Sequence, residues 1–477
     1  MMRTSRSFVF IGSMLCPCLG ASLLFLAIVA IAGVSSLLAQ PPNQQFVTVG
    51  VAQGIVMDST ALSKQKTYYS LKEAVKEPSK VYKLNLSFRK LRAFPIEIAQ
   101  MRNLQVLDLS NNEISSLPPQ IGNFSNLQHL NLSNNQLSTL PKQIGNLLLL
   151  SALYVTHNKL SSLPAEMGSL PQLTKLVLMS NQLTTLPPEI GLLANLHVLD
   201  VNNNRISFLP PQIGKLGNLN TLAANYNYLT ALPALGQCVK LEILQVVGNK
   251  ITALPQDIAL LENLRILDVV NNKLTELPLE IGSLKRLERL EASVNKLTKL
   301  PTSIGACESL QMLALGFNHI ASLPPEIKDL THLRTLILTG NQLTTLDSST
   351  CFLPNLQTLD LSSNRIKRIP DAIGHLTSLQ NLNLSDNQIG VVSLELGNLG
   401  RLQILSLSGN QISALPADIA KLTDLQTLLL SGNKLTSLPE EITGLVQLRS
   451  LEISSNPLSA LEKQRLATKF PNLVGTD

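Results

Sequence analysis

The stretch "LQVLDLSNNEISSLPPQIGNFSN", residues 104–126, contains the pattern that decides the fold. Its form is LxxLxLxxNxLxxLPxxIGxLxN, and it recurs from residue 81 almost to the end of the chain. The segment LxL places two leucines on the same face of a short strand, and one strand alone cannot bury that face. Stacked copies would form a parallel sheet whose leucines fill a continuous interior. The sequence therefore predicts a solenoid rather than a series of globular domains.

An asparagine marks the same position in each copy and gives the period of the repeat. Successive asparagines lie 23 residues apart, except for one step of 22 between Asn227 and Asn249. An earlier copy has Arg89 at this position, so the count is 17 repeats. Where the strand turns inward, the amide is expected to pair with main-chain groups that would otherwise be buried unpaired. The asparagines are Asn112, Asn135, Asn158, Asn181, Asn204, Asn227, Asn249, Asn272, Asn295, Asn318, Asn341, Asn364, Asn387, Asn410, Asn433 and Asn456.

This pattern resembles the leucine-rich repeat family, in its 23-residue LPxxIGxL class. Similar arrays occur in bacterial leucine-rich repeat proteins and in the Ras-group leucine-rich repeat proteins of eukaryotes. The resemblance covers residues 67–473. It implies an α/β solenoid, a horseshoe of about 17 repeats with a parallel concave β-sheet and short helical or irregular convex segments. It also implies that the protein acts mainly by binding other proteins.

The single 22-residue step lies in "LAANYNYLTALPALGQCVKL", residues 222–241. The pattern is intact up to Leu229, so the missing residue is predicted on the convex side, between Pro233 and Cys238. Cys238 and Cys307 occupy a position that is leucine in most copies, and both are predicted to be small core residues. No cysteine pair in the chain has metal-ligand spacing.

Both ends of the array, residues 81–457, are predicted to carry caps that cover the open edges of the sheet. Residues 67–80 contain the amphipathic segment "TYYSLKEAVKE", predicted to be a cap helix that stops at Pro78. Residues 458–477 form the second cap, expected as a short helix over the last repeat. Its apolar residues are Leu458, Leu461, Leu466 and Phe470.

Residues 1–39 are predicted to be either a cleaved signal peptide or a retained membrane anchor, followed by a linker at residues 40–66. Arg3 and Arg6 precede a long apolar run, and no charged residue lies between Arg6 and Asp58. The run is long enough to span a bilayer, and a small residue precedes Gln40, as at a cleavage site. In both cases the basic end favours the cytoplasm. The repeats are therefore expected outside it: secreted, periplasmic or membrane-anchored.

Charge and motifs argue against nucleic-acid binding and against catalysis. Residues 1–92 carry 11 Lys/Arg and 3 Asp/Glu, whereas residues 93–477 carry 27 and 29, so the repeats are no cationic platform. The chain contains no phosphate-binding loop, zinc-protease motif or nucleophile elbow. Acidic residues such as Asp268 and Glu291 could pair on adjacent strands, although such groups are more often solvated partners of Lys or Arg. We expect no enzyme activity, no cofactor and no metal.

The residues around the repeated asparagine are the best candidates for a binding site. Toward both ends of the array the two preceding residues are small and polar, whereas in the middle they become aromatic or apolar. Adjacent strands would bring them together as an exposed apolar patch, which usually marks an interaction site. The alternative is drift, because β-branched residues suit strands in general. The candidates, called the central patch below, are Tyr154, His157, Met179, Asn225, Tyr226, Tyr228, Val247, Val270, Val294, Phe317 and His319.

Three functions fit these observations. The first is an exported, monomeric, non-catalytic scaffold that binds a protein or peptide on its concave face, with the membrane as a further partner if residues 1–39 are retained. The second is an envelope or adhesion protein that binds polysaccharide through Tyr154, Tyr226 and Tyr228, although the absence of Trp disfavours it. The third is a cytoplasmic signalling adaptor of the Ras-group type, against which the N-terminal segment argues.

Overall fold

The structure is a computed structural model that describes residues 56–470 and 474–475. The predicted signal peptide or anchor at residues 1–39, and the linker as far as residue 55, lie outside the described residues. Among the helices that are described, none has the length and apolar character needed to cross a bilayer.

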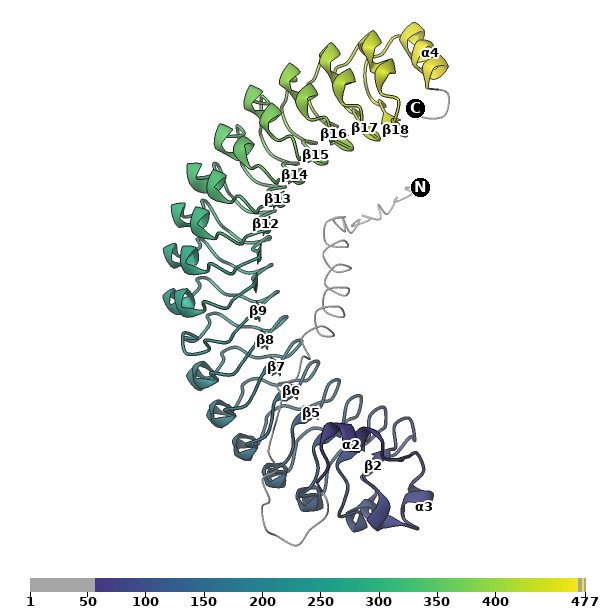
Figure 1. The fold of residues 1–477 in the computed structure, drawn as a ribbon, viewed down its shortest axis with the longest axis vertical. Helices are drawn as coiled ribbons and strands as arrows, with labels where there is room; N and C mark the ends of the chain where they lie inside the picture. Colours follow the sequence, from purple (N-terminus) through teal and green to yellow (C-terminus); the bar gives the residue numbers. More distant parts are fainter. Residues whose placement is uncertain (1–55, 471–473, 476–477) are drawn as a thin grey trace, which may run out of the picture. The chain divides into compact units, whose positions relative to one another are not determined.

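The described residues from 56 onward form an arc whose inner side is one parallel sheet of 19 strands (Figure 1). Each strand pairs in register with the strand of the next repeat, as Leu107 of β3 does with Leu130 of β4. The strands are β1 (Thr67–Tyr68), β2 (Lys83–Asn85), β3 (Val106–Asp108), β4 (His129–Asn131), β5 (Ala152–Tyr154), β6 (Lys175–Val177), β7 (Val198–Asp200), β8 (Thr221–Ala223), β9 (Ile243–Gln245), β10 (Ile266–Asp268), β11 (Arg289–Glu291), β12 (Met312–Ala314), β13 (Thr335–Ile337), β14 (Thr358–Asp360), β15 (Asn381–Asn383), β16 (Ile404–Ser406), β17 (Thr427–Leu429), β18 (Ser450–Glu452) and β19 (Val474–Gly475). Strands β2 to β18 belong to the 17 predicted repeats, and the two remaining strands flank them.

Short 3-10 helices form the outer side of the arc (Figure 1). They are η1 (Pro78–Lys80), η2 (Ile96–Gln100), η3 (Pro119–Asn123), η4 (Lys142–Asn146), η5 (Ala165–Ser169), η6 (Pro188–Leu192), η7 (Pro211–Lys215), η8 (Gln256–Leu260), η9 (Leu279–Ser283), η10 (Thr302–Ala306), η11 (Pro325–Asp329), η12 (Ser348–Phe352), η13 (Asp371–His375), η14 (Leu394–Asn398), η15 (Ala417–Lys421) and η16 (Glu440–Gly444). The described α-helices are α2 (Ser59–Ser63), α3 (Leu71–Ala74) and α4 (Ala460–Lys469). The predicted concave sheet with short convex helical segments is confirmed.

The core runs along the arc between the sheet and the 3-10 helices. Leu107 and Leu109 of one repeat and Ile121 of its convex segment are fully buried, and equivalent residues follow in the other repeats. The glycine that follows the isoleucine in the pattern LPxxIGxL lets the convex segments of neighbouring repeats stack closely. A Cβ atom at Gly145 would lie only 2.5 Å from the Glu166 carbonyl oxygen of the next repeat, so the backbone leaves no room for a side chain there.

The asparagine ladder satisfies the main-chain groups at the end of each strand, as predicted. Asn272 Nδ2 donates to the carbonyl oxygens of Val246, at 2.9 Å, and Val269, at 3.1 Å. Its Oδ1 accepts the main-chain N–H of Ile251 at 3.0 Å. Arg89 does not repeat this geometry. Its main-chain N–H donates to Asn112 Oδ1, and its guanidinium donates to the Tyr69 carbonyl oxygen of the N-terminal cap.

The short repeat loses its residue on the convex side, as expected. No 3-10 helix lies between β8 and β9, whereas the register of Leu222 with Leu244 is unchanged. Leu235 is buried in the shortened connection, and the main-chain N–H of Gly236 donates to Asp257 Oδ2 at 2.6 Å.

Both caps differ from the prediction in detail. The single helix predicted at residues 67–80 is wrong, because Thr67–Tyr68 is strand β1, paired with β2, and only Leu71–Ala74 is α-helical. The edge of the sheet offers unpaired main-chain groups, and pairing with them outweighs the weak helical preference of a short segment. Residues 59–63 of the predicted linker form α2.

At the C-terminal end α4 packs over the last repeat through Leu466 and Phe470, as predicted, whereas Leu461 is 78% exposed and not part of the cap core. Glu462 Oε1 accepts the Leu438 N–H at 2.9 Å, and Arg465 donates to the Leu438 carbonyl oxygen at 2.7 Å. Beyond α4, β19 adds a last strand to β18.

Candidate binding surface

The central patch lies at the end of the strands, mostly in the turn that leads into the repeated asparagine. Of its members only Tyr154 belongs to a strand, β5. The residue directly before the asparagine adopts a left-handed backbone, with φ of 50° at His157, 53° at Tyr226, 57° at Val294 and 54° at Phe317. This conformation favours glycine and asparagine, and it is strained for a β-branched residue such as Val294.

Two aromatic rings of the patch lean over a glycine of the following repeat. A Cβ atom at Gly248 would meet Tyr226 Cδ1 at 2.6 Å, and one at Gly340 would meet Phe317 Cδ1 at 2.7 Å. Each ring therefore needs a residue without a side chain beside it. The spacing of one repeat between aromatic residue and glycine is visible in the sequence, but it identifies a contact only once the turn geometry is known.

The patch is a broken row rather than one continuous surface. Tyr226, Tyr228 and Phe317 are 49%, 50% and 41% exposed, whereas Val247 and Val270 are half-buried. Tyr226 and Phe317 are four strands apart, a separation of about 19 Å along the sheet. Lys250 Nζ lies 4.8 Å from the centre of the Tyr228 ring, so a cation accompanies the aromatic group. The structure thus provides two aromatic contact points with half-buried valines between them.

The other members of the patch fall on both sides of these contact points. His157 and His319 are exposed, seven strands apart, and Met179 is half-buried between His157 and Tyr226. Asn225 has a structural role, because its main-chain N–H donates to Asn202 Oδ1 and its own Oδ1 accepts the Val247 N–H, at 2.6 and 2.7 Å.

The recurring acidic residue of the strands also has a structural role. Asp108 Oδ1 accepts the main-chain N–H of Ser110 at 2.8 Å, and Asp200 and Asp360 make the same contact two residues ahead. These carboxylates satisfy the first turn N–H after the strand. Repeats with no such acceptor use another side chain, as at Gly316, whose N–H donates to Ser293 Oγ of the preceding repeat.

The pairing of Asp268 with Glu291 on adjacent strands β10 and β11 is confirmed. Burial raises the pKa of Asp268 to about 7, and the carboxylate of Glu291 adds to the rise. Glu291 forms an ion pair with Arg289 of its own strand. Because Asp268 and Glu291 are only 2% and 3% exposed, they offer little surface to a substrate for acid–base chemistry.

Further candidates on the concave face come from the strands themselves. A hollow of about 200 Å³ lies over β3 to β5, where Asp108, His129, Asn131 and Tyr154 contribute to its lining. At the centre, Ile243, Ile266, Met312 and Ile337 are half-buried strand residues that alternate with inward leucines. None of these four residues is among the candidates predicted from the sequence, although period-2 alternation of the strand pattern identifies them.

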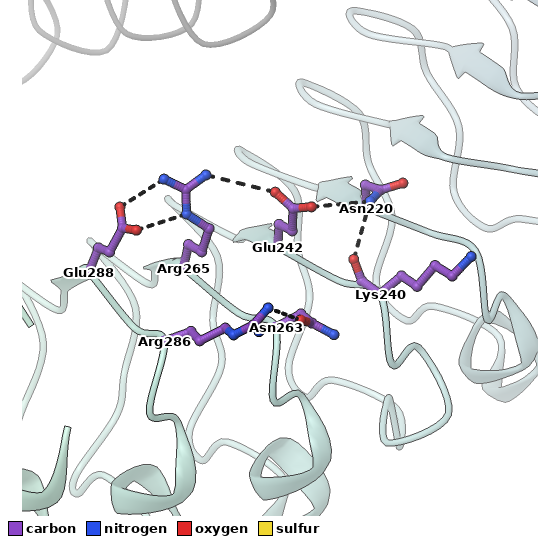
Figure 2. Close-up of polar contacts among 7 residues, drawn as sticks. All are labelled: Asn220, Lys240, Glu242, Asn263, Arg265, Arg286 and Glu288. Atoms are coloured by element: carbon purple, nitrogen blue, oxygen red, sulfur yellow. Dashed lines mark hydrogen bonds and ion pairs between the residues drawn. The ribbon is translucent and has the colours of Figure 1, made fainter. Parts of the chain in front are cut away.

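A second feature that the sequence analysis missed is a polar network beside the central strands (Figure 2). Arg265 contacts Glu288 through Nε and Nη2, at 2.9 and 3.0 Å, and lies 3.9 Å from Glu242. Asn220 Nδ2 donates to Glu242 Oε1 at 3.4 Å. All four residues immediately precede their strands, so they form one row across four repeats.

The cysteines of the repeats are buried, which confirms the core assignment of Cys238 and Cys307. Burial raises the pKa of both thiols to about 11. Cys238 Sγ lies 3.4 Å from the Ile213 carbonyl oxygen, and Cys307 Sγ lies 3.3 Å from that of Ile281. Because the thiols stay protonated, both residues are inert packing groups.

Comparison with solved structures relates this architecture to known proteins. A Leptospira interrogans leucine-rich repeat protein is 34% identical, with a TM-score of 0.63, over 86% of this chain and 99% of that one. The leucine-rich repeat ectodomain of the Arabidopsis thaliana membrane receptor kinase GASSHO1/SCHENGEN3, in complex with CASPARIAN STRIP INTEGRITY FACTOR 2, is 31% identical, with a TM-score of 0.53, over 82% of this chain and 55% of that one. The plant peptide hormone receptor RGFR1, in complex with RGF2, is 28% identical, with a TM-score of 0.51, over 82% of this chain and 77% of that one.

A search of curated proteins gave no match. Protein-family models, in contrast, match most of the array. Two further leucine-rich repeat models match residues 229–319, and residues 308–351 and 377–422. The model described as "Leucine rich repeat" matches residues 79–137, 102–160, 171–229, 194–251, 331–389 and 400–458. Since these segments cover more than half of the chain, and since the bacterial structure is a close relative over its whole length, the chain belongs to the leucine-rich repeat family.

Proposed function

We propose that this chain is a monomeric, non-catalytic scaffold that binds a protein or peptide on the concave face of its repeat array. The observation that carries the proposal is the pair of exposed aromatic contact points, at Tyr226 with Tyr228 and at Phe317, near the centre of the sheet. Large exposed aromatic side chains are favoured in protein interfaces, and here the fold does not require them. Two similar structures are receptors in complex with CASPARIAN STRIP INTEGRITY FACTOR 2 and RGF2, which supports the same use of this array.

The local backbone supports selection for binding over drift. Tyr226 and Phe317 occupy left-handed positions where most other repeats have glycine or a small polar residue. A left-handed backbone costs about 1 to 2 kcal/mol at such a residue. Each ring also lies against a glycine of the next repeat, Gly248 for Tyr226 and Gly340 for Phe317. An aromatic residue at this position therefore goes together with a glycine one repeat later, and two residues have to change rather than one.

The test compares partner capture by the full chain with capture by the double variant Tyr226→Ala, Phe317→Ala. We expect capture of the native partner to fall by at least tenfold with the midpoint of unfolding unchanged or raised, because both rings are exposed. The matched control is Leu192→Ala with Phe352→Ala, since both residues are exposed on convex segments η6 and η12. Equal capture by the two double variants would show that the central patch does not bind the partner and that its residues arose by drift.

We also propose that the repeats lie outside the cytoplasm, secreted, periplasmic or anchored. The support is the sequence of residues 1–39, with its basic start and long uncharged run. Cell fractionation followed by N-terminal sequencing tests this proposal. A mature start at Gln40 in the exported fraction indicates cleavage, and an intact start in the membrane fraction indicates an anchor. An intact chain in the cytoplasmic fraction contradicts export and favours the adaptor interpretation.

A further inference from the structure

One row of side chains on the inner side of the arc changes character along its length. It consists of the residue immediately before each repeat strand, and we call it the pre-strand row. Its main chain belongs to the sheet: the N–H of Gln403 donates to the Gln380 carbonyl oxygen at 2.7 Å, and the N–H of Gln426 donates to that of Gln403 at 2.8 Å. The side chains therefore follow one another at the strand spacing, about 4.8 Å.

The first stretch of the row holds a segment of the chain's own backbone. The main-chain N–H of Met57 donates to Gln105 Oε1 at 3.1 Å. Gln128 Nε2 donates to the Met57 carbonyl oxygen at 2.9 Å and to Gln105 Oε1 at 3.2 Å. Two carboxamides of neighbouring repeats thus hold the N–H and the C=O of a single residue. This contact recognises main chain, whatever side chain the residue carries.

The middle stretch of the row is closed by its own ion pairs. Glu242, Arg265 and Glu288 satisfy one another, and Asn220 is bonded to Glu242 (Figure 2). Their polar atoms are therefore engaged with neighbouring repeats of the same row. A ligand that used these groups would have to displace existing contacts, which makes this stretch a poor site for a polar backbone.

The last stretch of the row repeats the glutamines of the first stretch. Within residues 56–470 and 474–475, these side chains make no hydrogen bond or ion pair. The terminal guanidinium groups, of Arg334 and Arg449, are exposed, and the four glutamines between them are half-buried. In order, the residues of this last stretch are Arg334, Gln357, Gln380, Gln403, Gln426 and Arg449.

We propose that the row from Arg334 to Arg449 binds the main chain of an extended peptide that carries an acidic group at each end. Each carboxamide offers one acceptor and two donors, which suits a strand of N–H and C=O groups, as the contact with Met57 illustrates. Each guanidinium is matched to a carboxylate. Five strand steps span about 24 Å, the length of about seven extended residues. The inference rests on the proposed binding of a peptide to the concave face and names the part of the face and the ligand chemistry.

The experiment selects binders to the full chain from a displayed library of random heptapeptides. We expect enrichment of Asp or Glu at both ends and weak selection in the middle, because the central contacts are to main chain. A synthetic copy of an enriched peptide is then measured by fluorescence anisotropy. Methylation of its central backbone nitrogens should weaken binding by about tenfold or more, because it removes the donors that the carboxamides accept.

Variants of the protein test the row directly. Gln380→Leu with Gln403→Leu should weaken binding of the peptide by about tenfold. The isosteric pair Gln380→Glu with Gln403→Glu should weaken its binding as well, because the new carboxylates repel the acidic ends of the peptide. Gln388→Leu with Gln411→Leu is the matched control, since both residues are exposed in the same two repeats, after the strands. Arg334→Gln with Arg449→Gln should remove most of the salt dependence of binding.

The outcomes separate this inference from the proposed function. The enriched peptides could bind the Gln380 and Gln403 variants normally but fail to bind Tyr226→Ala with Phe317→Ala. This result would contradict peptide binding by the row and would leave the proposed binding on the concave face intact. The opposite pattern supports the row and assigns the central patch no part in peptide binding. Two further results would also contradict peptide binding by the row. One is failure to enrich any heptapeptide, and the other is binding of an acidic oligosaccharide that needs the arginines but not the glutamines.

Discussion

Asn272 illustrates at the scale of one residue how a polar group stabilises an apolar repeat. Its amide pairs with two carbonyl oxygens and one N–H, which are buried and would have no hydrogen-bond partner without it. Asn272→Leu keeps the branched shape of the side chain but leaves these groups without partners, at a cost of about 1 to 3 kcal/mol for each group. We expect a clearly lower midpoint in chemical denaturation. The exposed Gln411→Leu serves as the control, and equal midpoints would show that the ladder does not stabilise the array.

Asp268 is the residue whose charge the fold disfavours most clearly. Its pKa of about 7 lies above its ordinary value of 3.8, so the folded protein holds this proton more tightly than the unfolded chain. This contribution to the free energy of unfolding is therefore complete below about pH 4 and falls as the pH rises to about 7. The groups facing it are Glu291 and Arg289, which form an ion pair with each other.

Asp268→Asn should remove this pH dependence, because an amide still accepts the Val270 N–H without carrying a charge. We expect the free energy of unfolding of the variant to exceed that of the parent by about 1 to 4 kcal/mol at pH 7.5. The two proteins should converge toward pH 4. Urea denaturation at several pH values measures the difference, and a difference that stays constant with pH would contradict the assignment.

Single residues also mark the limit of what the sequence predicts. The asparagine ladder and the buried cysteines follow from spacing alone, because a fixed period places equivalent residues in equivalent surroundings. The left-handed turn at Tyr226 and the hydrogen bonds of Asn225 do not, since they depend on backbone angles that no composition signal carries. A candidate binding residue therefore turned out to be partly a structural one.

At the scale of elements, the repeats were predictable from the sequence, whereas the N-terminal cap was not. Strands β2 to β18 recur with the same pattern, and each is confirmed by its neighbours. Each cap occurs once, so its sequence must be interpreted without such support. Tyr68, Leu71 and Val75 have helical spacing, yet Tyr68 is buried as a strand residue because the edge of β2 offers pairing.

The C-terminal cap is expected to depend on the pair Glu462 and Arg465, which joins α4 to the main chain of Leu438. The hydrogen bond from Arg465 lowers the pKa of Glu462, so its stabilising effect is present above about pH 4.5 and is lost as the pH falls through the lowered value. Glu462→Ala leaves the buried Leu438 N–H unpaired. We expect faster amide hydrogen exchange in β17 and β18 with the rest of the array unchanged.

Glu441→Ala is the matched control for this prediction, because Glu441 is exposed on the neighbouring η16. Exchange that rises equally in both variants would show that the cap does not depend on the pair. Faster exchange along the whole array in Glu462→Ala would contradict the local character of the contact.

At the scale of the whole molecule, the array behaves as a row of units that contact only their neighbours. Strand pairing, the asparagine ladder and the packing of convex segments all join one repeat to the next. The free energy of unfolding is then approximately a sum over repeats and their interfaces. Binding features, in contrast, occupy particular repeats, which is why composition reveals the scaffold but not the residues that act on it.

Removal of one complete repeat tests this organisation. Deletion of residues 159–181 joins Asn158 to Gln182 and restores the pattern at the junction. Asn204 would then donate to the Val155 carbonyl oxygen that Asn181 uses now, and Gly145 would meet Glu189 in place of Glu166. We expect a folded protein with one cooperative transition and a denaturant m-value lower by about one part in 17, because less surface is exposed on unfolding. Deletion of residues 159–170 removes only half a repeat, breaks the register and should unfold the neighbouring repeats. If both deletions were tolerated equally, the stability of the array would not depend on the stacking of complete repeats.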